Sequence, residues 1–248
     1  DEFVVYYQVK VNNSGKVIGA EALIRWQHPE LGLVMPNEFI PIAEQGGKIT
    51  AITQWVIKRV CLDMADMKQW AHNSFRVSVN LSGHDLRNTH LFDYIYNTFM
   101  LCNVNPENFE FEVTESAYLE NFALSNKFFR RVGNMGCAIA LDDFGTAYSS
   151  LSYLTQINID TLKVDRQFVS EIQTTERSRL VTGAIIDLAK RLSLSICAEG
   201  IENIEQWDYL KNHGVDSVQG FMFSKPIPLD ALLQSPLYYN EQDFTIEL

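Results

Sequence analysis

The sequence predicts a (β/α)₈ barrel, and three observations lead to this fold class. Strand-like and helix-like segments alternate along the chain, which is typical of a parallel sheet covered by helices. The chain has 248 residues, close to the ~250 residues that are typical of such barrels. An opening hairpin and six later strands together provide eight strands. An open, doubly wound sheet is the alternative that the same alternation allows.

The first two strands are expected to pair as an antiparallel hairpin. Residues 3–11 and 17–26 are rich in apolar and β-branched side chains, and the "NNSG" between them is a turn signal. The segment 50–70 then carries apolar residues at helical spacing, including Ile52, Val56 and Val60.

The rest of the chain repeats a strand followed by a helix. Strands are expected at 75–82, 109–115, 137–143, 159–165, 194–200 and 215–220, with helices at 86–102, 117–135, 177–192 and 204–212. No Pro/Gly/Ser-rich linker divides the sequence, so we expect one domain over residues 1–248. Because the chain starts at Asp1 without Met and enters a strand almost at once, we expect this domain to belong to a longer, multidomain protein.

Composition limits the partners and the compartment. The net charge of −11 argues against a DNA or RNA polymer as partner, although a small phosphorylated ligand can still bind through metal ions. The four cysteines lie far apart without CxxC spacing, which favours reduced thiols in the cytoplasm. The sequence has no apolar run of the ~18 residues that a membrane span needs. A membrane connection is therefore expected only through other parts of a longer protein.

Polar residues lie where a barrel places its active site, at the carboxyl ends of the strands. These residues are Asn80, Glu112, Glu115, Asp142, Asp143, Lys163, Glu199 and Gln219. In the hairpin, alternate residues share one face, which brings Glu21, Leu23 and Arg25 together. An acid and a guanidinium group are thus expected to point into the same space.

The acids carry the strongest chemical signal. Two carboxylates about 4 Å apart repel each other by roughly 4 kcal/mol at an effective dielectric constant near 20, and five are expected in one concavity: Glu21, Glu112, Asp142, Asp143 and Glu199. Divalent cations prefer such oxygen ligands, with Asn80 as a neutral supplement. A metal site therefore explains this set better than separate helix caps or solvated loop residues. Lys163 is either a structural ion-pair partner or a group that positions or activates water.

Other site chemistries lack their motifs. The five histidines are dispersed without HxxxH or HExxH spacing, which argues against a histidine-based zinc site or a catalytic triad. The sequence contains no GxGxxG after a strand and no GxxxxGK[ST]. Dinucleotide-binding and P-loop functions are therefore not expected.

A series of motifs resembles the EAL domain family, bacterial phosphodiesterases that hydrolyse cyclic di-GMP. The motifs are "EALIRW", "FIPIAE", "SVNLS", "EVTES", "DDFGT", "LKVD", "AEGIE" and "QGFMFSKP", and the resemblance covers nearly the whole chain. It implies a modified (β/α)₈ barrel whose first strand runs antiparallel to the others, in agreement with the hairpin. It also implies that one phosphodiester bond is opened to give linear 5′-pGpG.

The resemblance assigns roles to individual residues. Two divalent cations, Mg²⁺ or Mn²⁺, are expected on Glu21, Asn80, Glu112, Asp142 and Asp143, and Ca²⁺ is expected to inhibit. Among the catalytic residues, Lys163 orients the attacking water, Glu199 binds near the second ion and Gln219 supports the same region. Glu115 anchors the "DDFGT" loop, which family members also use to form a homodimer. Gln8, Leu23 and Arg25 are the expected substrate contacts.

Two positions depart from the family pattern, and two other functions remain open. Val9 stands where the family often has Pro, and Ala147 stands where it often has Gly, but neither position is a metal ligand. We therefore expect an active enzyme. A catalytically inactive EAL-type receptor for cyclic di-GMP is the main alternative, although such proteins typically lose metal-binding acids. An enolase-type barrel lyase fits the metal argument but not the motifs.

Overall fold

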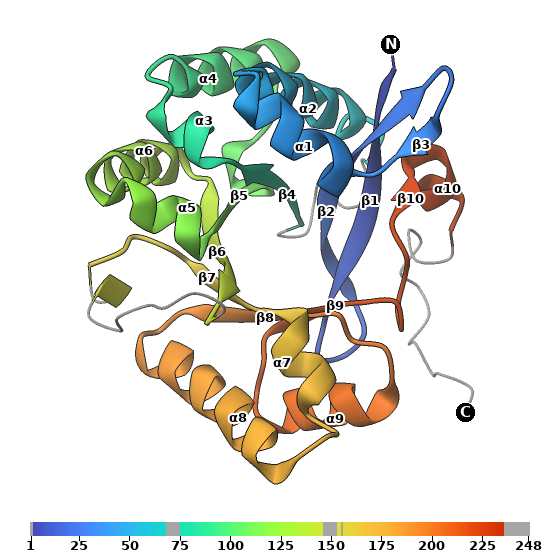
Figure 1. Ribbon diagram of the computed structural model, residues 1–248, viewed down its shortest axis with the longest axis vertical. Helices are drawn as coiled ribbons and strands as arrows, with labels where there is room; N and C mark the ends of the chain where they lie inside the picture. Colours follow the sequence, from blue (N-terminus) through green and yellow to red (C-terminus); the bar gives the residue numbers. More distant parts are fainter. Residues whose placement is uncertain (1, 68–74, 146–152, 155, 236–248) are drawn as a thin grey trace.

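The computed structural model describes residues 2–67, 75–145, 153–154 and 156–235, and its centre is a closed barrel (Figure 1). The strands are β1 (Phe3–Asn12), β2 (Val17–His28), β3 (Gly32–Val34), β4 (Arg76–Leu81), β5 (Phe109–Thr114), β6 (Ala138–Phe144), β7 (Thr161–Val164), β8 (Ser195–Glu199), β9 (Ser217–Gln219) and β10 (Ile227–Pro228). Eight of them, without β3 and β10, form a ring that β1 closes by pairing with both β2 and β9. The predicted barrel is confirmed, and the open sheet is excluded.

The antiparallel first strand is also confirmed. β1 pairs antiparallel with β2 and with β9, whereas the pairs from β2–β4 round to β8–β9 are parallel. The hairpin register places Gln8 opposite Glu21. Because β1 runs in the reverse direction, a residue later in β1 lies deeper in the barrel than an earlier one.

Helices surround the ring (Figure 1). They are α1 (Pro36–Gln45), α2 (Ile49–Asp63), α3 (Gly83–Arg87), α4 (Leu91–Cys102), the 3₁₀ turn η1 (Pro106–Asn108), α5 (Glu115–Glu120), α6 (Phe122–Met135), α7 (Arg166–Glu171), α8 (Glu176–Arg191), α9 (Ile204–Asn212) and α10 (Leu229–Gln234). The single helix expected at 117–135 is two helices, because Asn121 leaves the helical region with φ −143° and ψ 64°. Among the residues that the structure describes, no helix combines the length and apolar character needed to span a membrane.

The barrel strands are apolar on the outside and polar on the inside. Outward residues such as Phe109, Phe111 and Leu141 are fully buried against the helices and belong to one hydrophobic core. Val9 joins this core, so the departure at this position lies away from the polar interior. Ala147 lies outside the described residues. Strand alternation thus directs the polar side chains to a common interior, as the sequence pattern predicts.

At Gly220, directly after β9, the backbone of Ile201 leaves no room for a Cβ atom. A Cβ atom there would lie 2.1 Å from the carbonyl oxygen and 2.3 Å from the backbone nitrogen of Ile201. Since backbone cannot move aside as a side chain can, we expect Gly220→Ala to destabilise the protein by about 1–3 kcal/mol or more. The control is Gly133→Ala in α6, where the nearest atom is 3.6 Å away and alanine should add about 0.5–1 kcal/mol. Urea unfolding measures both, and equal stability of Gly220→Ala and wild type would contradict this packing.

Candidate active site

The predicted site residues come from different strands and meet in the barrel interior. Glu21 lies on β2, Asn80 on β4, Glu112 on β5 and Asp142 on β6. The parallel register aligns Asn80 with Glu112. These side chains therefore share one end of the barrel, the end at which the parallel strands terminate.

Lys163 lies at the centre of the acids. Its ammonium group contacts Asp142 Oδ2 at 3.0 Å and Glu199 Oε1 at 2.6 Å, and it also bonds Glu112 Oε2. The side chain is buried, so these ion pairs are shielded from water. Of the two roles that the sequence leaves open for Lys163, the ion-pair role is thus present in this structure.

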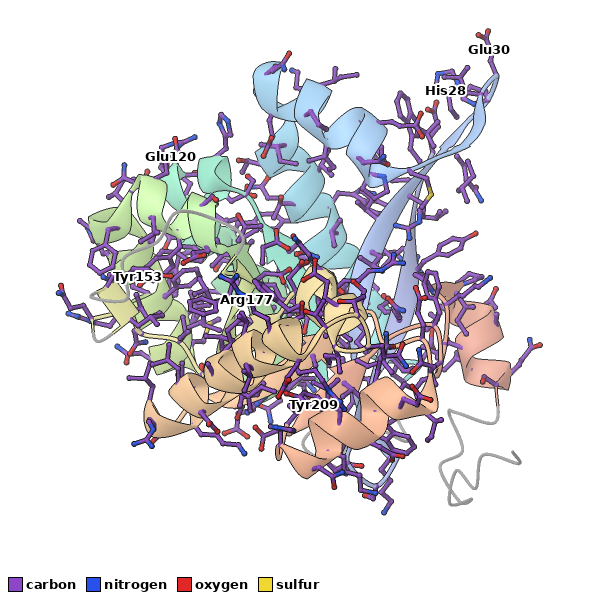
Figure 2. The ribbon with its side chains drawn as sticks, turned by 60° about the horizontal axis from the view of Figure 1, so that its bottom comes forward. His28, Glu30, Glu120, Tyr153, Arg177 and Tyr209 are labelled. Carbon is purple, nitrogen blue, oxygen red and sulfur yellow. The ribbon has the colours of Figure 1, made fainter. Side chains whose placement is uncertain are left out.

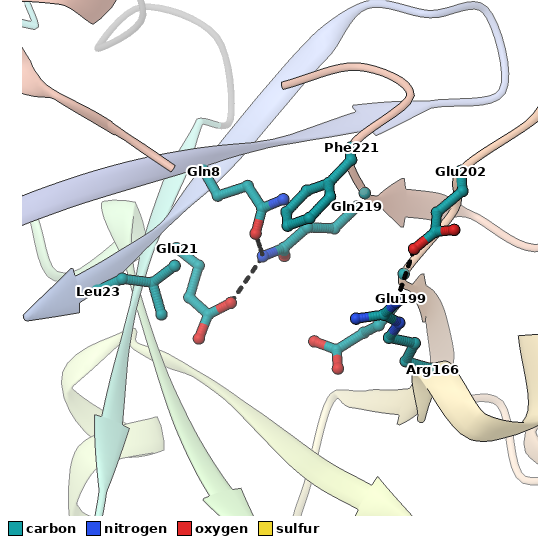
Figure 3. Close-up of a pocket in the computed structure, with 10 residues that line it drawn as sticks. Gln8, Glu21, Leu23, Arg166, Glu199, Glu202, Gln219 and Phe221 are labelled. Carbon is teal, nitrogen blue, oxygen red and sulfur yellow. Dashed lines mark hydrogen bonds and ion pairs between the residues drawn. The ribbon is translucent and has the colours of Figure 1, made fainter. Parts of the chain in front are cut away.

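A second network holds Glu21. Asn80 Nδ2 donates to Glu21 Oε1 at 2.7 Å, and Gln219 Nε2 donates to Glu21 Oε2 at 2.7 Å. Gln219 Nε2 also donates to Gln8 Oε1 at 3.0 Å (Figure 3). Gln8 Nε2 in turn donates to the carbonyl oxygen of Ser224 at 2.9 Å. Both carboxylate oxygens of Glu21 are therefore fixed by neutral amides.

The sequence reasoning missed Lys10 and Glu110, which lie below these residues. Lys10 Nζ bonds Glu110 Oε1 and Glu112 Oε1, each at 2.7 Å, and both Lys10 and Glu110 are buried. The signal was present in the sequence, because Lys10 lies two residues beyond Gln8 and therefore shares its face of β1. Two lysines, Lys10 and Lys163, thus neutralise part of the negative charge of the barrel interior.

The positive charges of Lys10 and Lys163 do not affect the pKa values of all the acids equally. Burial alone raises the pKa of Glu112, but the charges of Lys10 and Lys163 outweigh burial and lower this pKa to about 2. Burial raises the pKa of Glu199 to about 8 in spite of Lys163. Glu112, which contacts both lysines, is therefore held as a carboxylate, whereas for Glu199 the contact with Lys163 does not outweigh burial.

Two further acids have raised pKa values, and burial is the largest cause for both. Burial raises the pKa of Glu21. Burial and the neighbouring Asp142 raise the pKa of Asp143 to about 6. Six carboxyl groups, those of Glu21, Glu110, Glu112, Asp142, Asp143 and Glu199, face the two ammonium groups of Lys10 and Lys163. Added positive charge would therefore stabilise this set, which we call the acidic cluster.

The chemistry of the donor set fits a divalent cation. Its potential ligands are carboxylate oxygens and the amide oxygen of Asn80, the types that Mg²⁺ and Mn²⁺ prefer. Within the part of the chain that the structure describes, no three His, Cys, Asp or Glu side chains form a ready-made metal site. In this structure three of the carboxylates, those of Glu112, Asp142 and Glu199, contact Lys163.

A cavity of about 210 Å³ opens beside the acidic cluster (Figure 3). Gln8, Glu21, Leu23, Glu199 and Gln219 are among its lining residues. Leu23 also lines a second cavity of about 300 Å³, which is mostly apolar and lies against α1 and α2. The predicted substrate contacts Gln8 and Leu23 thus border open space next to the acids.

Arg25 and Glu115 lie away from the centre of the cluster. Arg25 is buried near the end of β2, with its guanidinium group 5.6 Å from the centre of the Tyr6 ring and bonded to the carbonyl oxygen of Ile24 at 2.9 Å. Glu115 accepts a bond from the backbone N–H of Gly145 at 3.2 Å. This contact ties Glu115 to the segment that follows Asp142 and Asp143.

Fold and site together define a class of protein: an α/β barrel with an oxygen-rich acidic cluster at the end where barrel enzymes keep their active sites. The family model described as the EAL domain matches residues 1–226. The chain belongs to the EAL domain family.

Curated relatives agree with this assignment. The chain is 37% identical over 235 residues to the bifunctional diguanylate cyclase/cyclic di-GMP phosphodiesterase MucR of Pseudomonas aeruginosa, covering 94% of this chain and 34% of the relative. It is 37% identical over 228 residues to the cyclic di-GMP phosphodiesterase PdeR of Escherichia coli, covering 92% of this chain and 33% of the relative. The chain thus spans about a third of the length of these relatives.

Solved structures show the same fold. The PaMucR phosphodiesterase in complex with c-di-GMP has a TM-score of 0.88 at 36% identity, with 94% of each chain covered. The EAL enzyme Bd1971, bound to cAMP and cyclic di-GMP, has a TM-score of 0.89 at 34% identity, with 94% of this chain and 64% of that chain covered.

Proposed function

We propose that this EAL domain hydrolyses cyclic di-GMP to linear 5′-pGpG with two divalent cations. The observation that carries the proposal is the acidic cluster beside a cavity, in which four carboxyl groups pair with two lysines and those of Glu21 and Asp143 lie within range of the same charges. The names of relatives such as PdeR and the c-di-GMP complex of the PaMucR phosphodiesterase support the substrate. A barrel lyase is not supported by these comparisons.

Glu21, Asn80, Glu112, Asp142 and Asp143 are the residues that would hold the cations, Mg²⁺ or Mn²⁺. When bound, such ions lower the pKa of a water molecule and stabilise the charge that develops on the phosphoryl oxygens. We expect Ca²⁺ to occupy the same ligands and to inhibit. The raised pKa values of Glu21 and Asp143 support this assignment, because burial and the neighbouring acids disfavour their charged forms and a bound cation would offset this.

The other site residues position the reacting groups. Lys163, which is held among three acids, orients the attacking water. Glu199 on β8, which contacts Lys163, would bind near the second ion. Gln219 fixes Glu21 and Gln8 at the cavity wall. Gln8, Leu23 and Arg25 contact the substrate, and the planar guanidinium group of Arg25 suits a phosphate oxygen pair. Glu115 anchors the segment after β6.

The setting of this activity is also a proposal. We place it in the cytoplasm, which is consistent with the free cysteines Cys61, Cys102, Cys137 and Cys197. We further propose that the chain pairs as a homodimer and that residues 1–248 act as one catalytic domain. The relatives, which are about three times as long, support a place for this domain within a larger protein. Any membrane connection would come from such other parts.

Incubation with cyclic di-GMP and Mg²⁺ or Mn²⁺ tests the function, with chromatography of the nucleotide products. We expect pGpG to accumulate with either ion and to be absent when the ions are chelated. Added Ca²⁺ should slow the reaction. Binding of cyclic di-GMP without any cleavage under these conditions would instead establish the receptor function. If the protein neither binds nor cleaves cyclic di-GMP, both the phosphodiesterase and the receptor function are refuted.

A further inference from the structure

A buried ionic layer lies directly below the acidic residues that face the cavity. Lys10 Nζ lies 2.6 Å from Ser78 Oγ, 2.7 Å from Glu110 Oε1 and 2.7 Å from Glu112 Oε1. Thr161 Oγ1 donates to the other oxygen of Glu110 at 3.1 Å. All of these side chains are buried. Among the residues that the structure describes, hydrogen bonds connect this layer to the proposed metal ligands through Glu112.

The two oxygens of Glu112 have different partners. Oε1 accepts from Lys10, whereas Oε2 bonds Lys163. Lys163 is shared with Asp142 and Glu199, so its contact with Glu112 can be exchanged when positive charge enters the cluster. Within the described part of the chain, the other hydrogen-bond partners of Lys10 are Ser78 and Glu110, which lie below Glu112 and are not proposed metal ligands. Lys10 therefore anchors Glu112 through Oε1, while Oε2 lies on the side of Lys163.

An ion pair is a costly way to fill this layer. Interior layers of α/β barrels are mostly packed with branched apolar side chains, and replacing a buried ion pair by apolar residues is often neutral or stabilising. The bonds of Lys10 to both Glu110 and Glu112 give the pair a use that apolar packing lacks. They fix the position of a carboxylate.

We infer that Lys10 is a positioning residue that holds the Glu112 carboxylate in place for a divalent cation, with Glu110 as its counter-charge. The inference rests on the proposed function, because it concerns the same cations. Partners that orient a metal ligand in this way typically contribute 10- to 100-fold to metal affinity.

The double variant Lys10→Met/Glu110→Gln tests the inference. It removes one positive and one negative charge together, so the net charge of the interior stays the same and Glu110 is not left as an unpaired acid. We expect it to remain folded and to bind Mn²⁺ at least about tenfold more weakly than wild type by isothermal titration calorimetry. Turnover should then need correspondingly higher Mn²⁺.

Glu110→Gln alone is the matched control. Its amide oxygen can still accept from Lys10, and the bond from Lys10 to Glu112 is kept, so Mn²⁺ affinity should stay close to wild type. If the double variant unfolds, Lys10→Gln/Glu110→Gln replaces it. This second pair keeps polar groups at both positions, but the shorter glutamine side chain does not reach Glu112, so the same loss of affinity is expected.

Equal Mn²⁺ affinity of the folded double variant and wild type would overturn the inference, as would tighter binding. A loss as large in Glu110→Gln as in the double variant would also overturn it, because the bond from Lys10 to Glu112 would then not be the cause. Failure of the wild-type protein to bind Mn²⁺ would be a different result. It would refute the proposed function.

Discussion

Replacing Glu21 by glutamine is expected to reduce cyclic di-GMP turnover by more than about a hundredfold, while the protein stays close to wild type in stability. A direct metal ligand should matter more than an outer partner, whose loss costs about 10- to 100-fold. Stability should be kept because burial already disfavours the charge of Glu21 and raises its pKa. The amides of Asn80 and Gln219 can rotate to pair with the new amide.

Turnover at saturating Mn²⁺ and urea unfolding measure the two parts of this prediction. Glu30→Gln is the control, since Glu30 is exposed in the turn between β2 and β3 (Figure 2) and its substitution removes the same charge away from the site. Turnover of Glu21→Gln within tenfold of wild type would show that Glu21 is not a metal ligand.

Replacing Lys163 by methionine is expected to affect both stability and catalysis. It leaves Glu112, Asp142 and Glu199 without their shared ammonium group, and removing one partner of a buried ion pair typically costs about 3–5 kcal/mol. Divalent cations that bind the folded state should restore part of this loss by mass action. Turnover should fall roughly 10²- to 10⁴-fold, the usual contribution of a group that assists proton transfer.

Thermal unfolding with EDTA and with Mn²⁺ separates these effects, and turnover is measured at saturating Mn²⁺. Lys58→Met, an exposed position on α2, controls for the loss of a lysine. Unchanged melting temperature in EDTA would contradict the role of Lys163 as the common counter-charge. Stability that fails to respond to Mn²⁺ would argue against cations in the same place.

Strand alternation made the barrel and its polar interior predictable. The hairpin at 3–26 and the polar residues at later strand ends follow from local patterns, and β1 closes the ring as expected. The break at Asn121 was not predicted, because the apolar spacing continues through it. The edge strands β3 and β10 were also missed. They are three and two residues long, too short for a periodic pattern.

The composition of the site was easier to predict than its internal pairing. Glu21, Glu112 and Asp142 could be placed together because parallel strands end at one rim. Which acid pairs with which lysine depends on side-chain reach across several strands, and local sequence does not encode that distance. The position of Lys10 below Glu112 depends in addition on the reversed direction of β1. The contrast between the pKa values of Glu112 and Glu199 follows from these contacts.

The proposed function requires that the acidic cluster bind divalent cations next to the bound dinucleotide. A high-resolution crystal structure with cyclic di-GMP and Ca²⁺ would reveal these ions, since Ca²⁺ should bind the same ligands without fast cleavage. We predict ions in contact with oxygens of Glu21, Asn80, Glu112, Asp142 and Asp143, beside a phosphate of the dinucleotide. A structure at saturating Ca²⁺ in which these carboxylates still close on Lys163, with no ion among them, would contradict the proposed function.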